Sequence, residues 1–141
     1  MRVIQTFFEK KTIRKRMVKM RVAITASGEN LDSPVDRVFG RARYFVITDP
    51  EGTNVEVLEN SQNVNAAQGA GIQAARQIAN KSVDILLTGN VGPNAFRALE
   101  AVSIRVYQFE SNILTVRDAL TAWKDGRLQE VKAPTAKGHG F

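Results

Sequence analysis

The side chains of this chain that could hold a ligand gather in loops next to predicted strands. These loops are dense in amide, hydroxyl and guanidinium groups and hold few carboxylates. Donors of this kind suit an anionic ligand held by hydrogen bonds, and they do not form the acid–base pair that a proton-transfer reaction needs. An equally good alternative is that Asn and Gly abound in these loops because they form turns. The candidate residues are Ser27, Arg37, Arg41, Arg43, Asn60, Gly89, Asn90, Gly92 and Asn94.

The turn Gly89–Asn94 carries the clearest local signal. It follows Ile85–Leu87, an apolar run with the length of a buried strand. Gly89 and Gly92 allow a tight turn, with positive φ if needed, and Pro93 suits the first position of a helix. A helix that starts here presents free backbone amides just past the end of a strand, a place suited to anions. On this stretch alone, a plain βα turn that binds nothing is the favoured interpretation.

Several enzyme chemistries are excluded by what the sequence lacks. The chain has no cysteine, and its only histidine is His139, near the C-terminus. A serine–histidine pair in the core is therefore excluded, and His139 is only a weak candidate for a metal ligand. A two-metal nuclease needs carboxylates on its central strands, and the first predicted strand, Arg21–Ala26, has none. Gly69-Ala70-Gly71 is a weak phosphate-loop signal because no Lys-Ser/Thr pair follows it. We therefore expect a protein that is not an enzyme.

The composition is that of one globular domain with a basic extension. Of 141 residues, 43% are hydrophobic and 24% are charged, and no apolar run approaches the length that crosses a bilayer. The net charge of +6 comes from residues 1–20, which hold seven basic residues and one acidic residue and leave 13 of each sign in residues 21–141. The predicted parts are an N-terminal extension over 1–19, a domain over 20–132 and a tail over 133–141.

The charge distribution and the missing cysteines also bear on partners and location. A nucleic-acid-binding domain needs its basic surface on the fold rather than on an extension, so we expect no nucleic-acid partner. We expect no membrane partner either. The absence of cysteine fits a cytoplasmic protein.

Hydrophobic periodicity predicts an α/β domain with the element order βββαβαβα. Helical crossovers are right-handed, so the two later strands join the sheet in parallel. The simplest result is a ribonuclease-H-like three-layer fold. Its five-stranded mixed sheet has the order 3-2-1-4-5, counted along the chain, and the second strand is antiparallel. Ligands in open α/β sheets bind where the strand order reverses, here between the first and fourth strands. The predicted strands are Arg21–Ala26, Tyr44–Thr48, Asn54–Glu59, a fourth strand that begins at Asp84 and contains Ile85–Leu87, and Ser103–Tyr107. The helices run from about Ala67 to Asn80, from Pro93 and from Thr115.

Three segments together resemble a known family. They are Phe39–Phe45, Gly69–Ala75 and Leu87–Leu99, and their sequences and order resemble the dinitrogenase iron–molybdenum cofactor biosynthesis family. The resemblance covers about Met20 to Lys132. It implies a ribonuclease-H-like fold, which agrees with the predicted topology, and it adds Phe39 and Gly40 to the candidate residues.

The resemblance also implies a function. Members of this family bind or carry an anionic iron–sulfur or iron–molybdenum cofactor, or its precursor, transiently and without catalysis, often while docked to a metallocofactor-assembly protein. Members that bind cofactor often have a histidine just before the Phe-Gly pair, where this chain has Val38. Without that histidine and without cysteine, the predicted cleft has no imidazole or thiolate ligand. The alternative is therefore a small interaction or regulatory module of the same fold that does not ligate a cluster.

Overall fold

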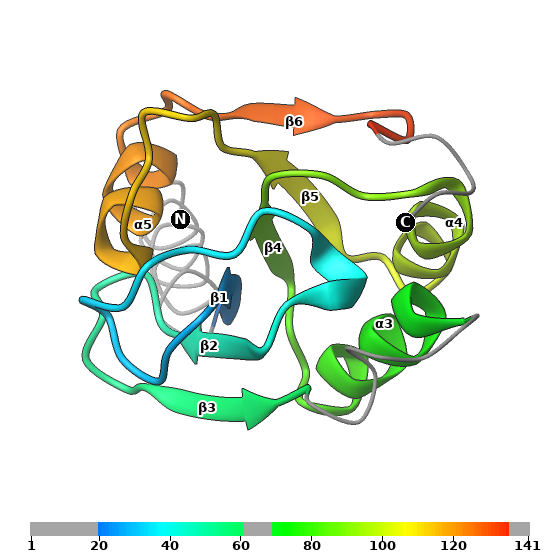
Figure 1. Ribbon diagram of the computed structural model, residues 1–141, viewed down its shortest axis with the longest axis horizontal. Helices are drawn as coiled ribbons and strands as arrows, with labels where there is room; N and C mark the ends of the chain where they lie inside the picture. Colours follow the sequence, from blue (N-terminus) through cyan, green and yellow to red (C-terminus); the bar gives the residue numbers. More distant parts are fainter. Residues whose placement is uncertain (1–19, 61–68, 136–141) are drawn as a thin grey trace, which may run out of the picture.

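The computed structural model describes residues 20–60 and 69–135. The predicted extension over 1–19 and the weak metal candidate His139 lie outside the described residues. Six strands form one mixed sheet in the order β3-β2-β1-β4-β5-β6 (Figure 1). The strands are β1 (Val22–Ala26), β2 (Tyr44–Thr48), β3 (Glu56–Glu59), β4 (Ile85–Thr88), β5 (Arg105–Gln108) and β6 (Gln129–Val131).

The pairing of the strands confirms most of the predicted sheet and corrects its edge. β1 pairs antiparallel with β2 and parallel with β4, and β5 pairs parallel with β4. The predicted count of five strands is wrong, because β6 pairs antiparallel with β5 and places Val131 opposite Val106. Three residues are too few to show a period of two, so β6 depends on its pairing with β5 rather than on a local pattern.

Helices cover both faces of the sheet. α3 (Ala70–Asn80) and α4 (Pro93–Ala101) lie on one face, and α5 (Val116–Lys124) lies on the other (Figure 1). A single turn of 3-10 helix, η1 (Phe39–Arg41), lies on the same face as α3 and α4 and contributes Phe39 to their core. The molecule therefore has three layers, with the sheet in the middle.

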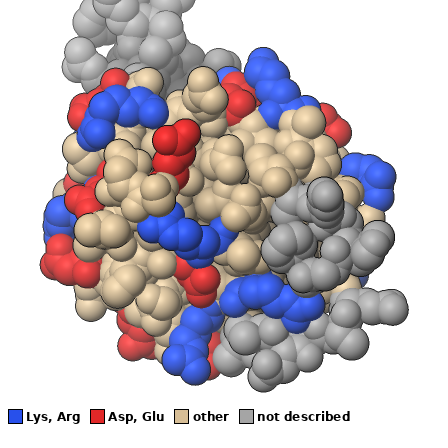
Figure 2. Space-filling model, turned by 45° about the horizontal axis from the view of Figure 1, so that its top comes forward, with Lys and Arg blue, Asp and Glu red and all other residues tan. Residues whose placement is uncertain are grey.

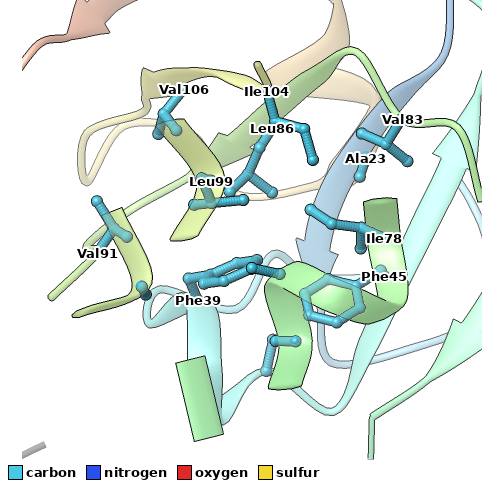
Figure 3. Close-up of a cluster of buried hydrophobic side chains, with 14 of the residues drawn as sticks. Ala23, Phe39, Phe45, Ile78, Val83, Leu86, Val91, Leu99, Ile104 and Val106 are labelled. Carbon is cyan, nitrogen blue, oxygen red and sulfur yellow. The ribbon is translucent and has the colours of Figure 1, made fainter. Parts of the chain in front are cut away.

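β1 is the strand that both cores share. All five of its residues are buried. Ala23 faces the cluster under α3 and α4, whereas Val22 and Ile24 face the cluster under α5. Figure 3 shows part of the first cluster, with Leu86 of β4 and Phe39 of η1 among its labelled side chains. A continuous apolar run is what a strand covered on both faces requires.

The helix ends follow local signals in the sequence. At the start of α5, the Thr115 hydroxyl accepts a hydrogen bond from the Asp118 N–H at 3.1 Å, and the Asp118 carboxylate accepts one from the Thr115 N–H at 3.2 Å. These two hydrogen bonds form a capping box, and they start α5 where the sequence predicts a helix. Gly126, just after α5, has φ of 74°, a left-handed conformation that glycine adopts without strain. Pro93 is the first residue of α4, as predicted.

The charged side chains of the folded domain are mixed in sign. On the face in Figure 2, basic and acidic side chains lie interspersed. Within the part of the chain that the structure describes, no helix is both long enough and apolar enough to cross a membrane.

Candidate functional site

The chain itself covers the point where the strand order reverses. Residues 36–39 pass over the carboxyl ends of β1 and β4. The Asp36 N–H donates to the Thr25 carbonyl at 2.9 Å, and the Thr25 hydroxyl donates to the Asp36 carbonyl at 2.6 Å. Farther along, Val38 forms a parallel bridge with Asn90. Backbone therefore occupies the position between the two strands where a ligand was predicted.

Gly89 makes this close approach possible. A Cβ atom on Gly89 would lie 2.5 Å from the Arg37 carbonyl oxygen and 3.0 Å from its Cα. Next to it, the Asn90 N–H donates to the same Arg37 carbonyl at 2.6 Å, and the Phe39 N–H donates to the Asn90 carbonyl at 3.0 Å. Gly89 is not among the described glycines that have a positive φ. Glycine is therefore required here for space and not for a left-handed backbone.

Two helix N-termini and η1 meet beside this covered point (Figure 1). A Cβ on Gly71, in the first turn of α3, would lie 2.6 Å from the Ala95 Cβ in the first turn of α4. A Cβ on Gly40 of η1 would lie 2.8 Å from the Gly71 nitrogen. Small residues at these three positions let the backbones touch. The first turns of α3 and α4 are therefore neighbours, and we call them the paired helix N-termini.

The paired helix N-termini have the electrostatics of an anion site. In the described chain, neither α3 nor α4 has a side chain that caps its first turn, and neither has an acidic residue there. Helix N-termini carry a partial positive charge from unpaired N–H groups, and a capping side chain or an acid normally offsets it. Gly92, the N-cap of α4, has open space around it, since a Cβ there would meet nothing within 4 Å. The backbone N–H groups in the first turn of α4 can therefore donate hydrogen bonds to an acceptor outside the protein.

Arg37 points away from the paired helix N-termini. Its guanidinium donates to the Glu110 carbonyl at 3.1 Å and to the Ile113 carbonyl at 2.8 Å. It also lies over the Phe109 ring, 5.8 Å from the ring centroid. These contacts hold the loop after β5 against residues 36–39, so Arg37 has a structural role in this arrangement.

Phe39 and Asn60 also hold the scaffold together. Phe39 is fully buried and packs on Phe45, with the ring centroids 5.4 Å apart. The buried Asn60 side chain donates to the Ala42 carbonyl at 2.7 Å and reaches the Gly40 carbonyl at 3.4 Å. Both residues therefore fix the shape of the η1 turn from its buried side.

The remaining predicted residues divide into two groups. Ser27 is exposed, and its hydroxyl and N–H donate to the Pro34 carbonyl, so it belongs to the loop after β1. Arg43 is exposed and follows η1, with its N–H 3.4 Å from an Asp36 carboxylate oxygen. Gly40, Arg41, Gly92 and Asn94 are the predicted residues that lie at or next to the paired helix N-termini.

Asn94 is the exposed second residue of α4. Its side-chain oxygen accepts a hydrogen bond from the Arg97 guanidinium one turn later. Arg97 therefore adds a basic group to the exposed surface near the paired helix N-termini.

Perturbed titratable groups lie elsewhere. Hydrogen bonds from Lys81 and Arg21 lower the pKa of Glu56, the first residue of the edge strand β3. The hydrogen bond from Arg105 lowers the pKa of Glu130 on β6. Over residues 20–60 and 69–135, no three His, Cys, Asp or Glu side chains come together as metal ligands would. The arrangement suits anion binding better than acid–base or metal chemistry.

Sequence reasoning missed some residues that shape this site. Gly71 belongs to the Gly69-Ala70-Gly71 run, which gave only a weak phosphate-loop signal, and its importance lies in the contact with Ala95. Gln108 donates to the Gly89 carbonyl at 2.8 Å, and Thr135 bonds to Val91. Both act across many residues of sequence, and no local pattern marks them.

The fold and the site define a class of α/β domain with a mixed sheet and two neighbouring helix N-termini that lack a capping side chain. The chain belongs to the dinitrogenase iron-molybdenum cofactor family, whose sequence model matches residues 20–126. This confirms the resemblance seen in the three sequence segments, and it relates the chain to nitrogen-fixation proteins.

Two solved structures and one further sequence relative are similar to this chain. The apo form of the orange protein from Desulfovibrio gigas is 42% identical and superposes with a TM-score of 0.78, over 83% of this chain and 97% of that protein. A NifB-like protein from Thermotoga is also 42% identical, with a TM-score of 0.73 over 84% of this chain and 99% of that one. An uncharacterised protein of Methanocaldococcus jannaschii is 30% identical over 95 residues, which are 65% of this chain and 78% of that protein.

Proposed function

We propose that this protein binds an anionic iron–sulfur or iron–molybdenum cofactor, or its precursor, and carries it between metallocofactor-assembly proteins without catalysis. The observation that carries the proposal is the pair of helix N-termini, both without a capping side chain or an acid in the described chain. Family membership gives the chemical class of the ligand. The strand order 3-2-1-4-5 with β2 antiparallel is our reason for also proposing a ribonuclease-H-like fold, with β6 added at its edge.

The donor set fits such a cofactor as an anion and does not fit it as a ligated metal centre. Backbone N–H groups and guanidinium groups donate hydrogen bonds to the sulfide or carboxylate atoms of an anionic cofactor. Soft metal centres need thiolate or imidazole ligands. The chain has no cysteine, and position 38, next to Asn90, holds a valine. We therefore expect a cofactor held by hydrogen bonds, which suits transient carriage.

In the proposed site, the amides of the first turns of α3 and α4 hold the anion, and the basic side chains contribute charge. Arg41 ends η1, and the open space around Gly92 lets the ligand approach the backbone there. Gly40 contributes by letting η1 pack directly against the backbone of Gly71 in the first turn of α3. Asn94 supplies a side-chain amide. Arg37, Phe39, Asn60, Gly89 and Asn90 maintain the shape of the surrounding loops, and Ser27 and Arg43 lie outside the first contact with the ligand.

The test is anaerobic incubation with isolated iron–molybdenum cofactor, followed by gel filtration and metal analysis of the protein peak. We expect a coloured protein that carries iron and molybdenum. Colourless protein with metal near zero would overturn the proposal. Arg41→Ala should weaken retention, whereas Arg76→Ala, which removes an exposed arginine farther along α3, should not.

The alternative is a small interaction or regulatory module of the same fold that does not ligate a cluster. Val38 favours it, because a valine cannot coordinate a metal. One measurement distinguishes the two functions: the binding of a protein partner with and without the cofactor. The module requires a stable complex with a protein partner that forms equally well in the presence and absence of the cofactor, whereas a carrier should release its metal to the partner as the complex forms.

A further inference from the structure

The turn Gly89–Val91, which leads into α4, is held from three sides by segments distant in sequence. From β5, the Gln108 side chain donates to the Gly89 carbonyl at 2.8 Å. From the loop before η1, the Arg37 carbonyl accepts from the Asn90 N–H at 2.6 Å. The third holder is Thr135, which comes after β6. Most of the backbone polar groups of this turn are thus already bonded within the protein.

Thr135 engages both backbone groups of Val91. The Thr135 N–H donates to the Val91 carbonyl at 2.9 Å, and the Thr135 hydroxyl accepts from the Val91 N–H at 2.8 Å. We call these two hydrogen bonds the Thr135 clasp. A residue without a hydroxyl can form only the first of them, so the clasp depends on the chemistry of the side chain at position 135.

The Thr135 clasp acts on the residue that sets the start of α4. Val91 comes just before Gly92, the N-cap of α4, and its side chain is buried in the core at 1% exposure. The core anchors the side chain of Val91 and the clasp anchors its backbone. Together they fix the direction in which the first amides of α4 point.

The three holders differ in how easily they can be removed. Gln108 is half-buried in β5, and the Arg37 carbonyl lies in a backbone crossing that Gly89 makes very tight. Thr135 is exposed, and the residues before it back to Lys132 are exposed as well. A partner that binds this segment can therefore lift Thr135 without unfolding the sheet.

We propose that Thr135 is a positioning residue for the anion site, and that opening of the Thr135 clasp is the step that releases the ligand. This inference rests on the proposed function. A loop held in its bound conformation binds more tightly because less ordering remains to be done on binding. With the clasp closed, the amides of α4 are ready for the anion. With it open, the turn loses one of its three holders and the ligand dissociates faster.

The first part of the test measures the clasp without any ligand. Thr135→Val keeps the shape of the side chain and removes the hydroxyl, whereas Thr135→Ser keeps the hydroxyl. Thr121→Val makes the same chemical change at an exposed position on α5. In hydrogen exchange followed by NMR, we expect the Val91 amide to exchange roughly tenfold faster in Thr135→Val, as loss of one hydrogen bond implies. Thr135→Ser and Thr121→Val should leave it unchanged.

The second part measures release. The protein is loaded with isolated iron–molybdenum cofactor, diluted anaerobically, and assayed for retained molybdenum over time. We expect release several-fold faster from Thr135→Val and from Thr135→Ala than from the unaltered protein, with Thr135→Ser and Thr121→Val unchanged. Equal release rates from Thr135→Val and the unaltered protein overturn this inference and leave the proposed function standing. Failure of the unaltered protein to bind cofactor overturns both.

Discussion

A single substitution at the start of α4 should stabilise the fold and weaken ligand binding at the same time. Asn94 is the second residue of α4, and that first turn has no acidic residue. Asn94→Asp places a negative charge at the partly positive end of the helix. The new carboxylate keeps the acceptor that now bonds to the Arg97 guanidinium. The new carboxylate therefore stabilises the fold through its attraction to the helix N-terminus, and it repels an anionic ligand bound at the same place.

The magnitudes follow from the exposure of Asn94. A charge complementary to a helix end contributes about 0.3–1 kcal/mol to the free energy of unfolding, which is roughly 1–4 °C in melting temperature for a chain of this size. Two like charges about 4 Å apart repel by about 1 kcal/mol in bulk water. Because the residue is exposed, the bulk-water value applies, and it weakens binding about fivefold for each unit of ligand charge.

The assays are urea unfolding for stability and anaerobic titration with isolated iron–molybdenum cofactor for affinity. Raising the salt to about 1 M should remove most of the affinity loss, because salt screens exposed charges. The matched control is Asn80→Asp at the last residue of α3, which adds the same charge far from the paired helix N-termini. A variant that is stabilised but binds the cofactor with unchanged affinity would show that the ligand lies elsewhere, and a destabilised variant would refute the electrostatic reasoning itself.

Three further substitutions test the scaffold. Gly89→Ala should lower the free energy of unfolding by about 1–3 kcal/mol, because its Cβ would meet the Arg37 backbone, and Gly92→Ala, with open space around it, should cost less than about 1 kcal/mol; equal losses in urea unfolding would contradict this. Thr115→Ala should cost about 0.5–2 kcal/mol in the same assay because it removes the capping box of α5, with exposed Thr121→Ala as the control. Glu56→Gln tests pH dependence: hydrogen bonds from Lys81 and Arg21 lower the pKa of Glu56 below 4.5, so the carboxylate stabilises the fold above that pH and loses its effect as the pH falls through the lowered pKa. The difference between the wild type and Glu56→Gln should be less than about 1 kcal/mol near pH 7, because the pair is exposed, and it should disappear in acid; a difference that persists in acid would mean that packing rather than charge is involved.

The parts of the fold that were predictable from sequence are those whose signals are local. Thr115 and Asp118 predict the start of α5 because the capping interaction spans three residues, and Pro93 predicts the start of α4 because its φ is fixed. Ile85–Leu87 predicts a buried strand because its residues are uniformly apolar. β6 was missed because it is short and exists only through pairing with β5.

The candidate site was predictable only in outline. The helix start at Pro93 and the neighbouring glycines indicated an anion site, and the structure brings a second helix start beside it. The direction of Arg37 was not predictable, because its partners Glu110 and Ile113 are more than 70 residues away and offer backbone carbonyls that leave no mark in sequence. The position of residues 36–39 over the ends of β1 and β4 was also not predictable. It depends on backbone contacts with distant residues, and the long polar loop before η1 has no periodicity from which its path could be inferred.

Successive side chains of β1, β2 and β4 point alternately into two separate hydrophobic cores, so substitutions in these strands can be directed to one core or the other. Phe45 and Leu86 belong to the core under α3 and α4, whereas Val46 and Leu87, their neighbours in sequence, belong to the core under α5. Substitutions in side chains that share no partner and lie well apart have nearly additive effects on stability. The layer under α5 can therefore be repacked or strengthened as a separate compartment, and stability gained there can offset destabilising changes made in the layer that carries the paired helix N-termini.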